Sequence, residues 1–290
     1  EPVLSQFGLV VKETTDEKTG VKTVVKKRLI LDGKRSHTNE AASSTQRLTL
    51  PRHVDGVADT MRMQRKALQR KSRDVAVDQV VLDYEDAYFM VPNYMWERRF
   101  QVAKWRNKYI VFLRTGQGMR LSSLTWGHIS ALVGRLSQSL DPQAMYVLIQ
   151  LYTDDPRMVL VGTEAERTMM LCVIVCAWLI LGLRVAFHKA KRGRQLVWTG
   201  VQYTLVAKGL EVTINPDLLD ELLAMTAEFL DINLVRARAL RKYTGKANFV
   251  ATLLPVWRPF LNALWAALHK HDENKKTAEE GKHAPPKRRI

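Results

Sequence analysis

The chain has 290 residues, of which 46% are hydrophobic, so we expect most of it to fold as two or three subdomains around a sizeable core. Its 45 Lys and Arg residues outnumber its 29 Asp and Glu residues, which gives a formal net charge of +16. This excess indicates a polyanionic partner such as nucleic acid, and a merely solvated basic surface is the alternative. Seven scattered histidines and two cysteines form no cluster with zinc-binding spacing.

The chain begins at Glu1 rather than at Met, so we expect a fragment or a processed product that could belong to a larger polyprotein with further domains. Cys172 and Cys176 lie in an apolar run and would share one helix face, which predicts buried free thiols in a reducing compartment. That run, residues 168–183, is shorter than the roughly 20 residues that cross a hydrocarbon core, so it predicts a buried core helix. With no membrane span and no visible signal peptide, we expect an intracellular protein of the cytoplasm or nucleus.

The first part of the chain predicts a mixture of strands and helices. Two β-type runs at residues 7–13 and 21–32 are joined by the turn-forming stretch TTDEKTG and predict a hairpin. Residues 56–73 follow a helical pattern and carry a strongly basic run. Beyond them we expect a strand at residues 80–92, a strand pair at residues 104–114 and a helix at residues 122–139.

The second part is expected to open with a hairpin, because apolar β-type runs flank the turn residues TDDP at 153–156. One strand is expected at residues 195–206. Asn215 as N-cap and Pro216 in the first turn predict a helix over residues 215–230. Finally, we expect helices at residues 232–243 and 248–268 with Gly245 between them, and a disordered basic tail at residues 269–290.

Three aspartates interrupt apolar β-type runs in this otherwise basic chain. Asp83 lies within VVLDYEDAYF, and Asp154 and Asp155 lie in the TDDP turn. Asp is common in hairpin turns because its side chain bonds nearby backbone N–H groups, so a plain turn is one interpretation. Three carboxylates at adjacent strand ends would instead hold two Mg²⁺ ions, an arrangement used for in-line phosphoryl transfer.

Two stretches resemble catalytic blocks of reverse transcriptases of the retroviral and retrotransposon type. These are VLDYEDAYFMVP at residues 81–92 and Tyr152-Thr153-Asp154-Asp155. The resemblance implies that Asp83, Asp154 and Asp155 are catalytic and bind two Mg²⁺ ions, with Mn²⁺ as a possible substitute. It also places Tyr152 beside the primer and template.

The same resemblance implies a nucleotide pocket around the first block. Tyr88 falls on the aromatic residue that crowds the sugar 2′ position, which implies a preference for deoxynucleotides. Asp86 is expected to be structural or to contact the sugar rather than a metal. The other residues of this block expected at the nucleotide are Tyr84 and Ala87.

Two further blocks extend the resemblance toward the triphosphate. RLILDGKR at residues 28–35 is similar to a fingers strand of the family, which implies that Arg28 clamps the triphosphate, with Lys12 as a weaker second phosphate contact. GQGMRLSSL is similar to the loop that touches the incoming nucleotide and the template, and it keeps Gln117 as a nucleotide contact. Gly116 and Ser123 stand where the family usually has prolines.

A last block, residues 182–200, resembles the family downstream of the aspartates. Lys189 falls on the lysine proposed to protonate the pyrophosphate leaving group. The turn expected to grip the primer 3′ end is Trp198-Thr199-Gly200.

Together the blocks imply an α+β fold of the right-hand polymerase type, with an antiparallel-sheet palm, mixed fingers and a helical thumb. The expected function is RNA-directed DNA polymerisation by two-metal phosphoryl transfer, with RNA and DNA template-primers and deoxynucleoside triphosphates as partners. The expected boundaries are 1–78 and 91–121 for the fingers, 79–90 and 122–205 for the palm, 206–268 for the thumb-like region and 269–290 for the tail.

Two alternatives remain open at this point. The chain could be a catalytically silent, domesticated palm that binds RNA or scaffolds a ribonucleoprotein. It could also be an RNA-copying polymerase with the same palm, but that choice needs a small residue at the position of Tyr88.

Overall fold

A computed structural model describes residues 4–15, 22–207, 209–232 and 234–283, and it confirms a mixed α+β fold. The chain divides into two compact units, residues 1–51 with 62–196 and residues 52–61 with 197–290. The boundary between the units falls within the helix His53–Gln69 and the strand Gln195–Trp198, and the other helices and strands each lie in one unit. The TTDEKTG turn lies largely outside the described residues, and so do the side chains of residues 12–26 and 271–283.

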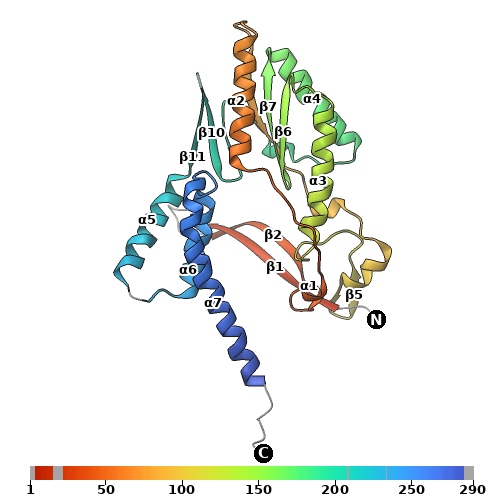
Figure 1. Cartoon of the computed structure of the whole chain (residues 1–290). Coiled ribbons are helices and arrows are strands. Elements are labelled where there is room, and N and C mark those ends of the chain that lie inside the picture. The colour runs from red at the N-terminus through yellow and green to blue at the C-terminus, as the bar shows by residue number, and fades with distance from the viewer. Residues whose placement is uncertain (1–3, 16–21, 208, 233, 284–290) are drawn as a thin grey trace, which may run out of the picture. The chain divides into compact units, whose positions relative to one another are not determined.

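The central sheet of the first unit has four antiparallel strands in the order β6-β7-β3-β8. The expected hairpin at the TDDP turn is confirmed, because β6 pairs with β7 along its whole length. Helix α3 contacts β6 and helix α4 contacts β7 (Figure 1). The bounds are β3 (Ala76–Val81), β6 (Val147–Tyr152), β7 (Asp155–Gly162), β8 (Lys191–Gly193), α3 (Ser122–Ser139) and α4 (Glu164–Ile180).

One large apolar core supports this sheet. Strand β7 is its most deeply buried member, with Met158, Leu160 and Val161 all fully buried. Trp126 of α3 and Trp178 of α4 are also fully buried and belong to the same cluster as Met158 and Leu160. This core fixes the ends of β3 and β7, where the three aspartates lie.

A second four-stranded sheet in the first unit has the order β2-β1-β4-β5. The two expected N-terminal strands and the expected strand pair are therefore confirmed in one sheet, with β5 at its edge. The bounds are β1 (Leu4–Thr15), β2 (Lys22–Asp32), β4 (Val102–Trp105) and β5 (Lys108–Val111), with α1 (Thr38–Ala41), η1 (Ala87–Met90) and η2 (Met95–Phe100) in the connections.

The second unit combines a three-stranded sheet with helices. Its sheet has the order β11-β10-β9, and α5 packs on α6, which packs on α7. Asn215 caps α5 as expected, because its side chain accepts a hydrogen bond from the Asp217 backbone N–H. The bounds are β9 (Gln195–Trp198), β10 (Val201–Val206), β11 (Gly209–Ile214), α5 (Pro216–Asp231), α6 (Ala237–Val250), η4 (Pro255–Trp257) and α7 (Arg258–His283); α2 (His53–Gln69) and η3 (Phe187–Lys189) complete the chain.

Several expected elements are corrected by the structure. The strand expected at residues 80–92 ends at Val81, and the strand expected over 195–206 is two strands joined at Thr199 and Gly200. Helix α6 runs through Gly245, which was expected to separate two helices, because tertiary packing outweighs the weak helix propensity of one glycine. Disorder was expected from residue 269 onward, but helix α7 continues to His283, so this expectation is wrong for residues 269–283.

Helix α4 is only half buried, which corrects the expectation of a fully buried core helix. One face is buried, but Met169 is 65% exposed and Ile180 is 85% exposed. Cys172 and Cys176 are free but exposed, not buried as expected. No described helix of the chain is both long and apolar enough to traverse a lipid bilayer.

Candidate active site

The first aspartate lies where the backbone that follows β3 is held from both sides. On one side the Tyr84 N–H donates to the carbonyl of Asp154 at 3.0 Å. On the other side the Ala186 N–H donates to the carbonyl of Asp83 at 2.8 Å. The segment 82–85 therefore lies between the TDDP turn and residues 184–186, although it forms no regular strand.

The charges of the three aspartates are close enough to affect one another. The pKa of Asp155 is raised to about 6, first by burial and then by the negative charges of Asp154 and Asp83, while the positive charge of Lys189 opposes the shift. Mutual repulsion of this kind is expected where several carboxylates share one site. The structure therefore brings together the three predicted acids and the predicted lysine.

Lys189 forms an ion pair with Asp83, in which the Lys189 Nζ contacts Asp83 Oδ2. The side chain of Asp83 is 19% exposed and that of Lys189 is 45% exposed, so the pair is open to solvent on the lysine side. Asp154 receives a different contact, because the Thr153 Oγ1 donates to its Oδ1 at 2.7 Å.

Oxygen donors of this kind suit Mg²⁺, so the chemistry of the donor set fits the expected ions. The positions of these side chains do not yet form a metal site, because within the described part of the chain no three His, Cys, Asp or Glu side chains converge as metal ligands. The ammonium group of Lys189 lies on Asp83 at the place where a cation would bind that carboxylate.

The aspartates line a cavity of about 510 Å³ in the first unit. The cavity is bounded by segments that are far apart in sequence, namely the end of β2, the residues after β3, the TDDP turn and η3. Its lining includes these predicted site residues: Arg28, Asp83, Tyr84, Asp86, Ala87, Tyr88, Gln117, Asp154, Asp155 and Lys189.

Some residues that line the cavity of the aspartates were not predicted from the sequence. Lys27, Glu85 and His188 also border the cavity. Each of them is adjacent in sequence to a predicted residue, and that adjacency was the only signal that could have identified them.

Tyr88 lies at a junction of two cavities. It lines the cavity of the aspartates and also a neighbouring cavity of about 410 Å³ that includes Arg28, Gln117 and Asp154. The pKa of its phenol is raised, first by burial and then by the charge of Asp154, whereas Arg28 opposes the shift. The ring is half-buried against the main core, so its position is fixed by packing.

The loop that carries Gln117 is held tightly against β2. The Leu31 N–H donates to the carbonyl of Gln117 at 2.9 Å. The next residue, Gly118, has φ of +100°, and a Cβ there would lie 2.2 Å from the carbonyl oxygen of Leu31. Only glycine fits this conformation and this close approach.

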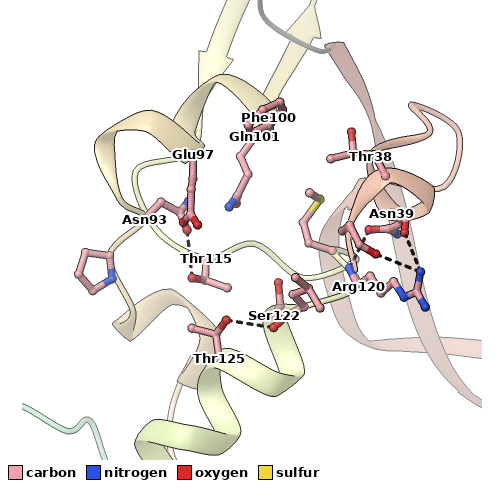
Figure 2. A pocket seen from close by; sticks show the side chains of 15 residues that line it. Thr38, Asn39, Asn93, Glu97, Phe100, Gln101, Thr115, Arg120, Ser122 and Thr125 are labelled. Carbon is pink, nitrogen blue, oxygen red and sulfur yellow. Dashed lines mark hydrogen bonds between the residues drawn. The ribbon is translucent and has the colours of Figure 1, made fainter. Parts of the chain in front are cut away.

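Asn39 of α1 holds the same loop from a second direction (Figure 2). Its Nδ2 donates to the carbonyl of Gly118 at 2.9 Å, and its Oδ1 accepts a hydrogen bond from the Arg120 N–H at 2.7 Å. Asn39 and Arg120 border a further cavity of about 300 Å³, between α1, η2 and the start of α3. Hydrogen bonds thus fix the loop, which has Gly116 and Ser123 at the two positions where the resemblance leads one to expect prolines.

Tyr84 borders the cavity, but its ring faces the core. The residue is 2% exposed. Its ring packs edge-on against Trp126 at 5.8 Å and Trp178 at 5.2 Å between centroids. The neighbouring Asp83 points to the site, and alternation along an extended backbone turns Tyr84 into the core.

Trp198, which was expected at the primer, likewise has its ring in the core. It is 1% exposed and packs in the second unit with His53 and Tyr203. The turn itself has the two positive φ angles of a tight hairpin, 47° at Thr199 and 84° at Gly200.

Two predicted residues remain to be placed. Tyr152 ends β6 directly opposite Asp155 and is half-buried. Lys12 lies on β1 opposite Lys26, and its side chain lies outside the described residues.

No model of a protein family and no curated protein matches the sequence. Solved structures do match in fold. One is the foamy viral protease-reverse transcriptase in complex with an RNA/DNA hybrid, with a TM-score of 0.56 and 14% identity, and the match covers 92% of this chain and 30% of that chain. Another is a foamy viral protease-reverse transcriptase in complex with double-stranded DNA, with a TM-score of 0.51 and 16% identity over 89% of this chain and 41% of that one. The chain spans less than half the length of these two structures, and its fold is similar to a reverse transcriptase fold.

Proposed function

We propose that this chain is an RNA-directed DNA polymerase that adds deoxynucleotides to a primer 3′ end. The observation that carries this proposal is the cavity that Asp83, Asp154, Asp155 and Lys189 line together. The similarity of the fold to viral reverse transcriptases supports it. A plain hairpin turn would not require a half-buried carboxyl group with a raised pKa beside two other acids.

Asp83, Asp154 and Asp155 would hold two Mg²⁺ ions, or Mn²⁺ in their place. When bound, these ions would lower the pKa of the primer 3′-hydroxyl and stabilise the negative charge of the leaving pyrophosphate. Because Lys189 neutralises Asp83 in this structure, its ammonium group would have to leave that carboxylate first.

The other cavity residues would bind and select the nucleotide. Arg28 is exposed at the rim and would contact the triphosphate. Lys189, once released from Asp83, would donate a proton from its Nζ to the pyrophosphate leaving group. Tyr88 would lie beneath the sugar and exclude a 2′-hydroxyl. Gln117 would contact the nucleotide from the loop that is hydrogen-bonded to β2 and α1.

Nucleic acid is the proposed macromolecular partner. The net charge of +16 favours a polyanion, and phosphate contacts would hold a duplex without reading its sequence. The solved structures with a similar fold are described as complexes with an RNA/DNA hybrid and with double-stranded DNA.

One observation favours a second candidate, a catalytically silent protein that binds nucleic acid. Asp83 is already paired with Lys189, and no three acidic or histidine side chains converge as ligands among the residues that the structure describes. In this second candidate the ion pair would be a permanent structural contact.

Primer extension separates the two candidates. The chain is incubated with deoxynucleoside triphosphates and primed homopolymer RNA or DNA, in Mg²⁺, in Mn²⁺ or in EDTA. The proposed polymerase extends the primer only with a divalent ion, and it prefers deoxynucleotides. Binding of the primed template without any extension in either metal would instead support the silent protein.

A further inference from the structure

The hairpin of β4 and β5 exposes large aromatic side chains at the edge of its sheet. Trp105 is 56% exposed and Tyr109 is 62% exposed. All four residues of β5 are exposed, and among the described strands β5 is the edge strand of its sheet, next to β4. None of the hairpin residues lines the cavity of the three aspartates.

The same hairpin carries an excess of positive charge. Residues 98–114 contain six Lys and Arg residues and no Asp or Glu. Lys104, Arg106 and Lys108 form no ion pair within the described part of the chain. Like charges so close together repel one another, and a polyanion would remove that repulsion.

Aromatic rings and cations alternate across the hairpin. Lys104 lies opposite Tyr109, and Trp105 lies opposite Lys108. Directly opposite residues of an antiparallel pair share a face, so each face of the hairpin carries one large ring beside one ammonium group. This combination matches a strand of nucleic acid, which presents flat bases and phosphates at regular intervals.

The ring of Trp105 is supported from the protein side. Phe7 of β1 contacts it edge-on at 6.3 Å between centroids, and Phe7 also packs against Phe112 at 5.9 Å. Residues 4–7 and residues 104–106 line a hollow of about 490 Å³ beside this ring. Trp105 is therefore fixed on one side and open on the other.

Protection of the β5 edge against pairing with another chain would explain the lysines of the hairpin, but it would not explain the exposed aromatic rings. Natural proteins place lysines on edge strands to prevent pairing with another chain. Exposed aromatic side chains would weaken such protection, because they add apolar surface to the edge. A protein partner would be expected to match Lys104, Arg106 and Lys108 with acids of its own, whereas single-stranded nucleic acid supplies both charge and stacking.

We propose that the β4–β5 hairpin is a binding site for single-stranded nucleic acid. A base stacks on Trp105 in the hollow, and Lys104, Arg106 and Lys108 neutralise the adjoining phosphates. In the proposed polymerase this strand is the unpaired part of the template, and only this assignment rests on the proposed function.

The test compares single strands with duplexes on the full chain in EDTA, which prevents extension. Fluorescence anisotropy measures the affinity for a labelled oligo(U) 12-mer and for a blunt RNA/DNA duplex. Trp105→Ala is expected to weaken binding of the 12-mer about tenfold and to change binding of the duplex less than twofold. Trp105→Phe keeps a ring and is expected to retain most of the affinity, which separates stacking from a folding defect.

Trp96→Ala is the matched control, because Trp96 is 65% exposed in the same unit but lies beside Glu97. It is expected to leave the affinity for the 12-mer unchanged. The double variant Lys104→Gln/Lys108→Gln is expected to reduce the slope of log affinity against log salt by about 1.4, since each phosphate contact on a single strand contributes about 0.7.

Several results would overturn the proposal. These are an unchanged affinity for the 12-mer in Trp105→Ala, an equal loss for 12-mer and duplex, or an equal loss in Trp96→Ala. A variant that changed only self-association, measured by sedimentation, would assign the β5 edge to contact between copies of this chain. If the 12-mer results hold while primer extension fails, the binding site stands and the polymerase proposal falls.

Discussion

The ionised form of Asp155 is destabilised by its surroundings. Its pKa is raised to about 6 from the ordinary value of 3.8, mainly by burial and then by Asp154 and Asp83. A group whose pKa is higher in the folded protein than in the unfolded chain favours folding when protonated. Its contribution to stability therefore falls as pH rises from about 4 to about 6.

This shift leads to a stability prediction. Without metal ions at pH 7, Asp155→Asn is expected to raise the free energy of unfolding by about 1 kcal/mol, after a discount for partial solvent exposure. At pH 4 the gain should vanish, because the wild-type carboxyl group is then protonated. Urea unfolding in EDTA at both pH values measures this, and the exposed Asp74→Asn provides the control. A loss of stability at pH 7 would contradict the assigned surroundings of Asp155.

Tyr88 is the residue that would discriminate between deoxynucleotides and ribonucleotides. Discrimination by a clash against the wrong substrate disappears when the clashing group is removed. Tyr88→Ala or Tyr88→Val is therefore expected to improve incorporation of ribonucleotides relative to deoxynucleotides by about tenfold or more, about 1.4 kcal/mol for each factor of ten. Activity with deoxynucleotides should fall only modestly.

The measurement is the ratio of kcat/KM for dTTP and UTP on a poly(A) template, for the wild type and each variant. Phe89→Ala is a suitable control, because Phe89 is adjacent and also borders the cavity of the aspartates. An unchanged ratio in the Tyr88 variants would mean that Tyr88 only packs against the core.

The motifs predicted correctly that the three acids lie close together, but they did not predict whether the neighbouring side chains point to the cavity or to the core. Asp83, Asp154 and Asp155 were predicted from acids embedded in apolar runs, and the structure brings them together at one cavity. Tyr84 and Trp198 were expected to contact the nucleotide or the primer, but both rings are buried. A motif does not specify which side of the backbone meets the core, because that depends on the packing of Trp126 and Trp178.

At the scale of elements, α1 and β2 together hold the loop that carries Gln117. Asn39 is expected to act as a positioning residue, since it bonds Gly118 and Arg120 but does not line the cavity of the aspartates. Asn39→Ala removes both hydrogen bonds and is expected to raise the KM for deoxynucleotides several-fold with a smaller change in kcat. The free energy of unfolding should fall by about 1 kcal/mol.

Glu40→Gln is the matched control, because Glu40 lies on the same short helix but pairs with the exposed His37 and not, among the described contacts, with the loop. Steady-state kinetics on a primed template separate KM from kcat. A fall in kcat with an unchanged KM in Asn39→Ala would show that the hydrogen bonds of Asn39 do not position the nucleotide side of the loop.

Helices and strands with clear end signals were predicted well. Helix α3 matches the expected residues 122–139, and Asn215 with Pro216 marked the start of α5. The residue pattern predicted a single strand over residues 195–206, whereas the resemblance implied a turn at Trp198-Thr199-Gly200, and the structure has a tight turn there with two positive φ angles. Strand β11 was missed as well, although Leu210, Val212 and Ile214 alternate with the polar Glu211 and Thr213 in the pattern of a half-buried strand.

At the scale of the whole molecule, the charge of +16 should dominate binding of a template-primer. Each phosphate neutralised on a duplex adds about 0.9 to the slope of log affinity against log salt. We expect a slope of at least about 3, with little dependence on sequence, between roughly 50 and 200 mM salt. Anisotropy titrations on two unrelated duplex sequences measure both quantities, and a flat salt dependence would show that the charge merely solvates the surface.

The central claim is that the three aspartates form the catalytic site of a DNA polymerase. The most direct test is extension of a primer on an RNA template with Mg²⁺ by the wild type, Asp154→Asn and Asp74→Asn, together with the affinity of each for the same duplex. Asp154→Asn removes a carboxylate that we propose to bind metal and keeps the size of the side chain, whereas Asp74 is exposed and borders none of the described cavities. We predict that Asp154→Asn abolishes extension, that Asp74→Asn extends like the wild type, and that all three bind the duplex with similar affinity. Extension by Asp154→Asn at the wild-type rate would contradict the claim.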